Sequence, residues 1–271
     1  MKNATLTALR TPGSILALVI LAVALLWAVF PGWFSNQNPI VGEDVALLPP
    51  SGAHWFGTDS VGRDLFTRVV YGTRYTLAGA LVAVAVGLVF GTLLGLLAGS
   101  LRGWADTVIM RVVDVLLSIP GLLLSLSLII VLGFGTINAA VAVGVTTIAT
   151  FARLARSQVM SVAGSDFVEA AYGSGATRAQ VLLRHILPNS LTPVLALAAV
   201  QFGMAILQLS VLGFLGYGAP PPTPEWGLLI SEARDFMATS WWLTVLPGIV
   251  IIAVVVSANH LSQQLNRNQE A

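Results

Sequence analysis

Few side chains in this sequence could do chemistry, and the first group of them lies in a polar stretch near residue 60. His54, Asp59 and Asp64 carry the imidazole and carboxylate groups that bind divalent metals. Arg63 and Arg68 are equally close in sequence, and ion pairs with these arginines are a simpler role for the two acids. Because the histidine has no second histidine or cysteine near it, we expect no metal site here.

The same stretch predicts a short helix that lies along the outer membrane surface. Apolar residues recur at helical spacing from Leu65 to Tyr71, and this spacing places Arg68 on the side that faces away. The candidate caps are small polar residues that precede the helix, namely Thr58, Asp59 and Ser60.

A second polar stretch, residues 165–189, predicts two helices joined by a turn. Glu169 falls in the first turn of the first helix. The residues expected to begin and end the two helices are, in chain order, Ser165 or Asp166, Gly173 with Gly175, Thr177 and Pro188. Such a segment is either a solvated connector or a projection that contacts a partner.

Several absences limit what the chain does by itself. Lys2 is the only lysine, so the Gly-Lys-Ser/Thr loop that holds ATP phosphates cannot form. The chain has no cysteine, which excludes disulfides and thiolate sites, and its net charge of +1 is no nucleic-acid signature. We therefore expect no catalytic residue, no metal, no cofactor and no nucleic-acid partner.

The elements that position these polar residues must be membrane helices. Hydrophobic residues make up 56% of the 271 residues and charged residues 9%, against about a quarter charged in soluble domains. About 20 apolar residues cross a bilayer as a helix. The stretches that satisfy this need are Ser14–Phe34, Thr76–Ser100, Val112–Gly133, Ile137–Phe151, Pro193–Leu215 and Trp241–Ala258. The predicted fold is therefore an all-α integral membrane protein of about six transmembrane helices in contact with lipid.

The basic residues divide unequally between the two sides of these spans. One side holds Lys2, Arg10, Arg102, Arg111, Arg153, Arg156, Arg178, Arg184 and Arg267. The other side holds only Arg63, Arg68, Arg74 and Arg234. Because basic residues stay in the cytoplasm, both termini and residues 165–189 are expected to be cytoplasmic.

The spans carry packing residues but hardly any ionisable ones. Gly87, Gly91, Gly95 and Gly99 stack on one face of the second span, where another helix can approach closely. The polar residues within or next to later spans are Asn138, Gln201 and Gln208, for which hydrogen bonds between helices are favoured over substrate contact. An ion-coupled secondary transporter, the alternative from a different class, usually needs buried acids or histidines.

The spacing in the cytoplasmic stretch resembles a known family. Glu169-Ala170-Ala171, three residues, Gly175, nine residues and then His185 to Pro188 match the EAA loop of ABC importer permeases. The runs Gly57-Thr58-Asp59-x-x-Gly62-Arg63-Asp64 and 222–227 resemble the oligopeptide, dipeptide and nickel branch, and within it the C-type subunit. His185 at the isoleucine position and the sequence 257–264 depart from the family pattern.

The resemblance implies a type I ABC importer permease fold in the bacterial inner membrane. Residues 1–75 would form an anchor and outer segment, and residues 76–271 a five-helix core with the EAA loop at 157–190. Residues implied to dock an ATPase are Asp166, Glu169, Ala170, Ala171, Gly175 and Arg178.

The resemblance also implies partners and a range of solutes. The partners would be a second homologous permease, two ATPase subunits that bind ATP and magnesium, and an extracytoplasmic solute-binding protein. The solute would be a di- or oligopeptide, with nickel or a metal chelate as the alternative.

Overall fold

The computed structural model describes residues 11–101 and 103–270, with side chains up to residue 264. Lys2, Arg10 and Arg102, which contribute to the expected orientation, lie outside the described residues, as does the side chain of Arg267. The described residues form helices and no strands. The longer helices are α2 (Pro12–Val29), α3 (Leu65–Leu101), α4 (Gly103–Ser118), α5 (Gly121–Leu132), α6 (Thr136–Ala163), α9 (Leu187–Phe214) and α11 (Trp242–Glu270). The shorter ones are η1 (Pro31–Trp33), α7 (Asp166–Gly173), α8 (Arg178–Val181), η2 (Leu182–Ile186), α10 (Trp226–Ala233) and η3 (Arg234–Phe236).

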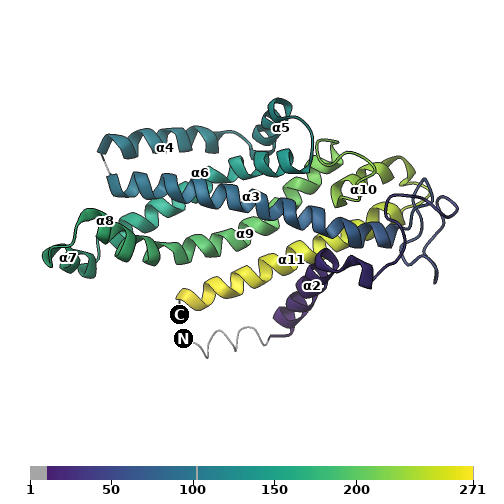
Figure 1. The fold of residues 1–271 in the computed structure, drawn as a ribbon, viewed down its shortest axis with the longest axis horizontal. Coiled ribbons are helices and arrows are strands. Elements are labelled where there is room, and N and C mark those ends of the chain that lie inside the picture. The colour runs from purple at the N-terminus through teal and green to yellow at the C-terminus, as the bar shows by residue number, and fades with distance from the viewer. Residues whose placement is uncertain (1–10, 102, 271) are drawn as a thin grey trace.

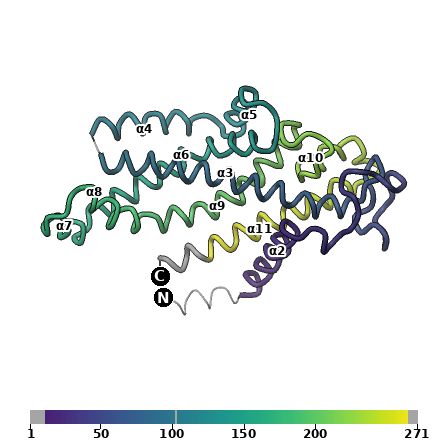
Figure 2. The backbone as a smooth tube through the Cα atoms, viewed as in Figure 1, coloured from purple at the N-terminus to yellow at the C-terminus, as the bar shows by residue number. Residues whose placement is uncertain are grey.

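The long helices run along one axis and separate two polar ends. Helices α3, α6, α9 and α11 lie side by side, with α2 against α3 and α11 (Figure 1). The segment between α2 and α3 lies at one end, and α7 with α8 lies at the other (Figure 2). Among the described residues five helices are long and apolar enough to cross a membrane, or six if α4 and α5 count as one bent span.

The third predicted span, Val112–Gly133, is not one straight helix, because the chain bends by 97° between α4 and α5. Pro120 lies at this bend and is the N-cap residue of α5. Proline donates no backbone hydrogen bond and disfavours helical geometry at the residue before it, so the helix ends at Ser118. Two ion pairs join α4 to α6, from Arg156 to Asp106 at 2.6 Å and from Arg153 to Asp114 at 2.6 Å.

The predicted surface helix over Leu65–Tyr71 is also wrong as a separate element. These residues form the first turns of the 37-residue α3. Arg68 was expected on an exposed face, but it is 1% exposed. The segment before α3 and helix α10 cover that face, a contact that local spacing does not reveal.

The four glycines of α3 lie on its contact with α6. A Cβ atom at Gly91 would lie 2.5 Å from the Cβ of Phe151, and one at Gly95 would lie 2.5 Å from the carbonyl oxygen of Ala152. Only a residue without a side chain allows the two backbones to come this close.

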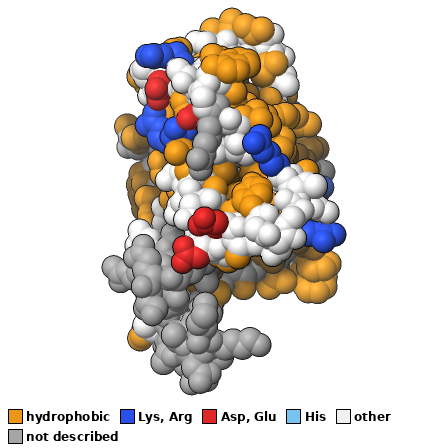
Figure 3. Space-filling model, turned by 90° about the vertical axis from the view of Figure 1, so that its left-hand side faces the viewer, with side chains coloured by type: hydrophobic (Ala, Val, Ile, Leu, Met, Phe, Trp, Pro, Cys, Tyr) orange, Lys and Arg blue, Asp and Glu red, His pale blue; other side chains and the backbone are white. Residues whose placement is uncertain are grey.

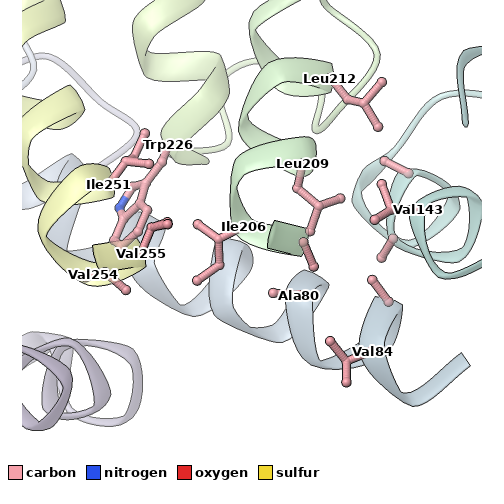
Figure 4. Packing of buried hydrophobic residues seen from close by; sticks show 14 of the residues in the cluster. Ala80, Val84, Val143, Ile206, Leu209, Leu212, Trp226, Ile251, Val254 and Val255 are labelled. Atoms are coloured by element: carbon pink, nitrogen blue, oxygen red, sulfur yellow. The ribbon is translucent and has the colours of Figure 1, made fainter. Parts of the chain in front are cut away.

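The core of the bundle joins four long helices and α10. Ala80 and Val84 of α3 belong to one buried cluster with residues of α6, α9, α10 and α11 (Figure 4). Trp226 of α10 is fully buried there, and its Nε1 donates a hydrogen bond to the carbonyl oxygen of Val69 at 3.0 Å. The other labelled members are Val143, Ile206, Leu209, Leu212, Ile251, Val254 and Val255. The Trp226 indole thus anchors α10 against the first turns of α3.

The polar residues of the later spans behave differently from one another. Asn138 Nδ2, on α6, donates to the carbonyl oxygens of Leu132, the last residue of α5, and of Gly133, so it joins α6 to the end of α5, as predicted. The Oε1 atom of Gln208 is buried without a hydrogen-bond partner among the described residues.

Candidate functional site

The polar end formed by the segment between α2 and α3, together with α10, is organised around the carboxylate of Asp59. Its Oδ2 accepts hydrogen bonds from Arg63 Nε at 2.6 Å and from Arg68 Nη1 at 2.7 Å. Glu232 Oε2 accepts from the same Arg68 nitrogen at 2.8 Å and from Arg63 Nη2 at 3.3 Å. Arg68 Nη2 also donates to the carbonyl oxygen of Pro222 at 3.2 Å. Two arginines thus join the segment before α3 to α10 and to the loop that precedes it.

Charge and backbone geometry stabilise the ionised form of Asp59. Burial raises the pKa of this carboxyl, but backbone N–H groups of Arg63 and Val61 and the charge of Arg68 outweigh burial. The net result is a pKa below the ordinary value of 3.8. Asp59 therefore stays charged and holds both arginines.

Asp64 has two roles, neither of which is an ion pair with arginine. Its Oδ1 accepts from the backbone N–H and the hydroxyl of Thr67, both at 2.7 Å, which makes Asp64 the cap of α3. Its Oδ2 lies 2.9 Å from His54 Nδ1. The predicted caps Thr58, Asp59 and Ser60 are wrong, because the chain turns once more before the helix starts. His54 and the acids are thus engaged in hydrogen bonds within the fold.

The remaining residues of the run 57–64 build the turn that carries these charges. Gly57 and Gly62 have φ of +77° and +79°, which favours glycine. The hydroxyl of Thr58 is fully buried, donates to the carbonyl oxygen of Val45 at 2.7 Å and accepts from the N–H of Leu48 at 2.8 Å. The run 57–64 is therefore a compact structural unit.

Glu225 is a buried acid whose setting the sequence analysis missed. It caps α10 by accepting from the N–H groups of Gly227 and Leu228, both at 3.0 Å, and from the hydroxyl of Thr76 at 3.3 Å. Burial raises the pKa of its carboxyl, although these donors oppose the shift. The available signal was the run Glu225-Trp226-Gly227, which is an acid directly before a helix start.

At the opposite end, α7 sits on an apolar base and presents a polar face. Val168 is 1% exposed and packs with Val159, Val181 and Ile186. Glu169 and Ala170 are exposed, and Ala171 is partly buried against the same cluster. The helix is therefore held in place by one side while the other side faces outward.

Gly175 ends α7 in a Schellman motif. Its φ is +86°, its N–H donates to the carbonyl oxygen of Tyr172, and the N–H of Ala176 donates to that of Ala171. Gly173 stays in the helix, so the prediction that both glycines break it is wrong for Gly173. Gly175, with its left-handed backbone geometry, therefore reverses the direction of the chain after α7.

Thr177 caps α8 as predicted, and α8 ends at Val181, but the chain stays helical beyond it and through Pro188. Thr177 and Gln180 form a capping box at the start of α8. The chain then passes through the π-helical turn η2 into α9, with Pro188 in the first turn. Because the wider turn changes the backbone pairing, proline is accommodated and the loop continues directly into a membrane-crossing helix.

Charged side chains of both signs mark this end of the molecule (Figure 3). Asp166 and Glu169 lie in the first turn of α7, and Arg178 begins α8. All three are exposed, and none forms an ion pair with another described residue. The six residues implied to dock an ATPase thus lie on one α7–Gly175–α8 unit, which we call the coupling loop.

Comparison with known proteins decides the family of a chain with these two polar ends. Residues 91–270 match the family of binding-protein-dependent transport system inner membrane components. The chain belongs to this family. It is thus a membrane-embedded permease of the ABC importer class. This assignment takes the place of the alternative interpretation as an ion-coupled secondary transporter.

Curated relatives cover most of this permease. The probable D,D-dipeptide transport system permease protein DdpC of Escherichia coli is 41% identical over 92% of this chain and 84% of its own length. The dipeptide transport system permease protein DppC of Alkalihalophilus pseudofirmus is 40% identical over 93% and 83%. The glutathione transport system permease protein GsiD of Pectobacterium atrosepticum is 40% identical over 92% and 82%.

Solved structures share the fold of the permease. The inward-facing MetNI methionine ABC transporter matches 74% of this chain and 97% of the solved chain, with a TM-score of 0.58 and 20% identity. An amino acid ABC transporter solved with histidines matches 75% and 94%, with a TM-score of 0.58 and 15% identity. The predicted all-α, type I ABC permease fold is confirmed.

Proposed function

We propose that the chain forms, with a second homologous permease, the pathway of an ATP-driven importer of di- or oligopeptides. The family depends on a binding protein, so an extracytoplasmic protein would deliver the solute. The three relatives described above are named for a D,D-dipeptide, a dipeptide and glutathione, each of which contains amino acids joined by amide bonds. This shared chemistry supports a peptide solute.

The nickel alternative lacks support from either source. None of these three relatives is named for a metal. The described residues contain no group of three or more His, Asp or Glu side chains arranged to hold a metal ion. A peptide is therefore the better proposal.

The observation that carries the proposed mechanism is the coupling loop. Val168 fixes α7 to the end of α6, while Glu169 and Ala170 remain free to enter a cleft on an ATPase subunit. We propose that Asp166, Ala171, Gly175 and Arg178 belong to the same docking surface. Closure of two ATPase subunits around ATP and magnesium would then move the loop as a rigid body and shift the permease between inward-facing and outward-facing states.

This mechanism requires one orientation of the chain in the membrane and assigns separate roles to its segments and to its partners. The coupling loop and both termini would lie in the cytoplasm, and the cluster around Asp59 would face outward. Residues 1–75 would act as anchor and outer segment, and residues 76–271 as the permease core. With Lys2 as its only lysine, the chain would leave nucleotide binding to its partners.

The complete transporter in proteoliposomes tests this function. Radiolabelled dialanine on the external binding protein should accumulate when the vesicles contain ATP, and proton and sodium ionophores should not prevent accumulation. Radioactive nickel offered in parallel should not accumulate. Uptake that needs an ion gradient but no ATP, or uptake of nickel alone, would overturn the proposal.

A further inference from the structure

An open cavity of about 810 Å³ lies between α3 and the connection from α5 to α6. This volume is within the range of about 300–1,000 Å³ that is usual for ligand pockets. Its walls are residues 74–82 of α3 and residues 134–140 around the start of α6. The cavity begins directly after the turns of α3 that hold the outer ionic cluster, so it belongs to the outer half of the permease.

Arg74 is the one charged residue in the lining of this cavity. Its side chain is exposed, and its guanidinium carbon lies 5.6 Å from the centre of the Tyr75 ring. Within the described part of the chain, Arg63 and Arg68 each bind two carboxylates, whereas Arg74 pairs with none. Arg74 thus presents an unneutralised cation to a largely apolar space.

The second wall of the cavity is the turn between α5 and α6. Gly133 and Gly135 have φ of +88° and +132°, and Asn138 Nδ2 donates to two carbonyl oxygens of this turn. Phe134 projects from it, 67% exposed, with its ring 5.7 Å from that of Tyr217. A Cβ atom added at Gly135 would meet no other atom within 4 Å, so the turn borders open space. This wall supplies apolar surface and no acid that would neutralise Arg74.

We propose that Arg74 binds the terminal carboxylate of the peptide as the solute passes the outer half of the pathway. A guanidinium matches a carboxylate through two parallel hydrogen bonds, and low-dielectric walls strengthen that attraction. The apolar remainder of the lining accommodates side chains of varied shape. This inference rests on the proposed peptide import and adds a specificity-determining residue to it.

Paired substrates test the role of Arg74 in the complete transporter. Radiolabelled dialanine and its C-terminal amide are each supplied on saturated binding protein, and each variant's uptake is divided by that of the wild type for the same substrate. This ratio cancels the preference of the binding protein. Arg74→Gln should lower dialanine uptake about tenfold and leave amide uptake within about twofold, because only dialanine loses a charged hydrogen bond. Arg74→Lys should retain most uptake of both.

The matched control is Arg234→Gln. Arg234 is an outer arginine with a side chain 62% exposed, and it does not line the cavity. The Arg234→Gln transporter should take up both substrates as well as the wild type does. Equal losses of dialanine and amide in Arg74→Gln would overturn the inference, because they would indicate a structural or subunit contact.

A thiol measurement keeps the inference testable if the amide is not transported. The chain has no cysteine, so Ala78→Cys introduces its single thiol into the cavity wall. An anionic sulfonate thiol reagent should label Ala78→Cys severalfold faster than a cationic reagent of the same size, and adding Arg74→Gln should abolish the difference. Equal rates for both reagents would overturn the inference.

The two proposals fail in distinguishable ways. A wild-type transporter that accumulates no peptide contradicts the proposed function. A wild type that accumulates peptide while Arg74→Gln transports dialanine equally well contradicts only the inference about Arg74.

Discussion

Arg68 donates from a single nitrogen, Nη1, to Asp59 at 2.7 Å and to Glu232 at 2.8 Å. The two acids lie more than 170 positions apart in the sequence, one in the segment before α3 and one in α10. One guanidinium that is 1% exposed therefore holds the segment before α3, α3 itself and α10 together.

Replacing this arginine should destabilise the fold. Arg68→Leu leaves two mostly buried carboxylates with Arg63 as their only basic partner, and breaking a buried pair costs roughly 3–5 kcal/mol. Because Arg63 remains, we expect a loss near the lower limit, seen as a lower unfolding temperature of the purified protein in detergent. Arg234→Leu, an exposed control, should change little. An unchanged unfolding temperature in Arg68→Leu would show that the cluster contributes no net stability.

Acid should remove the contribution of Asp59. Its pKa in the folded protein lies below the ordinary 3.8, so its stabilisation is complete above that pH and is lost as the pH falls through the lower folded value. The difference in unfolding temperature between wild type and Asp59→Asn should be constant near neutral pH and shrink only below 3.8. A difference that shrinks already near neutral pH would contradict the lowered pKa.

Charge reversal on α7 should uncouple the proposed motor from transport. Glu169→Lys places a cation on the exposed face and leaves the buried Val168 contact intact, so the protein should insert normally. Uptake by the complete transporter should fall about tenfold or more, as for a central interface residue, while ATP hydrolysis no longer responds to loaded binding protein. Glu169→Gln should show a smaller loss. Wild-type uptake by Glu169→Lys would count against docking through this residue.

The two glycines of the coupling loop should respond to alanine with opposite signs. Gly175→Ala forces a side chain into left-handed geometry at a cost of about 1 kcal/mol, so amides at the end of α7 should exchange hydrogen faster. Gly173→Ala, the matched control, adds a helix-favouring residue where no atom lies within 4 Å, so exchange should slow. The same direction of change in both variants would contradict the Schellman geometry.

The contact between α3 and α6 should tolerate no added methyl group at Gly95. A Cβ there would lie 2.5 Å from the carbonyl oxygen of Ala152, and overpacking of this kind costs roughly 1–3 kcal/mol. Gly95→Ala should therefore lower the unfolding temperature. Gly248→Ala, on α11 with no atom within 4 Å, should not. Equal unfolding temperatures for the two variants would mean that the helices separate easily.

The sequence predicts the membrane-crossing stretches because lipid requires long apolar helices with internally paired backbones. It marks Pro120 with Gly121 as residues that can kink a span, but it does not give the 97° bend, since proline occurs in straight and bent spans alike. Thr177 is recognisable as a cap because its partner Gln180 lies three residues away. Arg68 was misplaced because its partner Glu232 comes from a distant segment, and periodicity reports a face without revealing what covers it.

Helix α3 is longer than the hydrocarbon layer of a membrane is thick. Its 37 residues, at about 1.5 Å each, measure about 55 Å, against a hydrocarbon thickness of about 30 Å. Neither α3 nor its partner α6 contains proline, whereas α9 contains Pro193 and α11 contains Pro247. A helix resists shortening, so a push at one end of α3 reaches the other end as tilt and not as compression. The α3–α6 pair therefore has uninterrupted backbone hydrogen bonding along its length, whereas Pro193 and Pro247 each remove one helical hydrogen bond from α9 and α11.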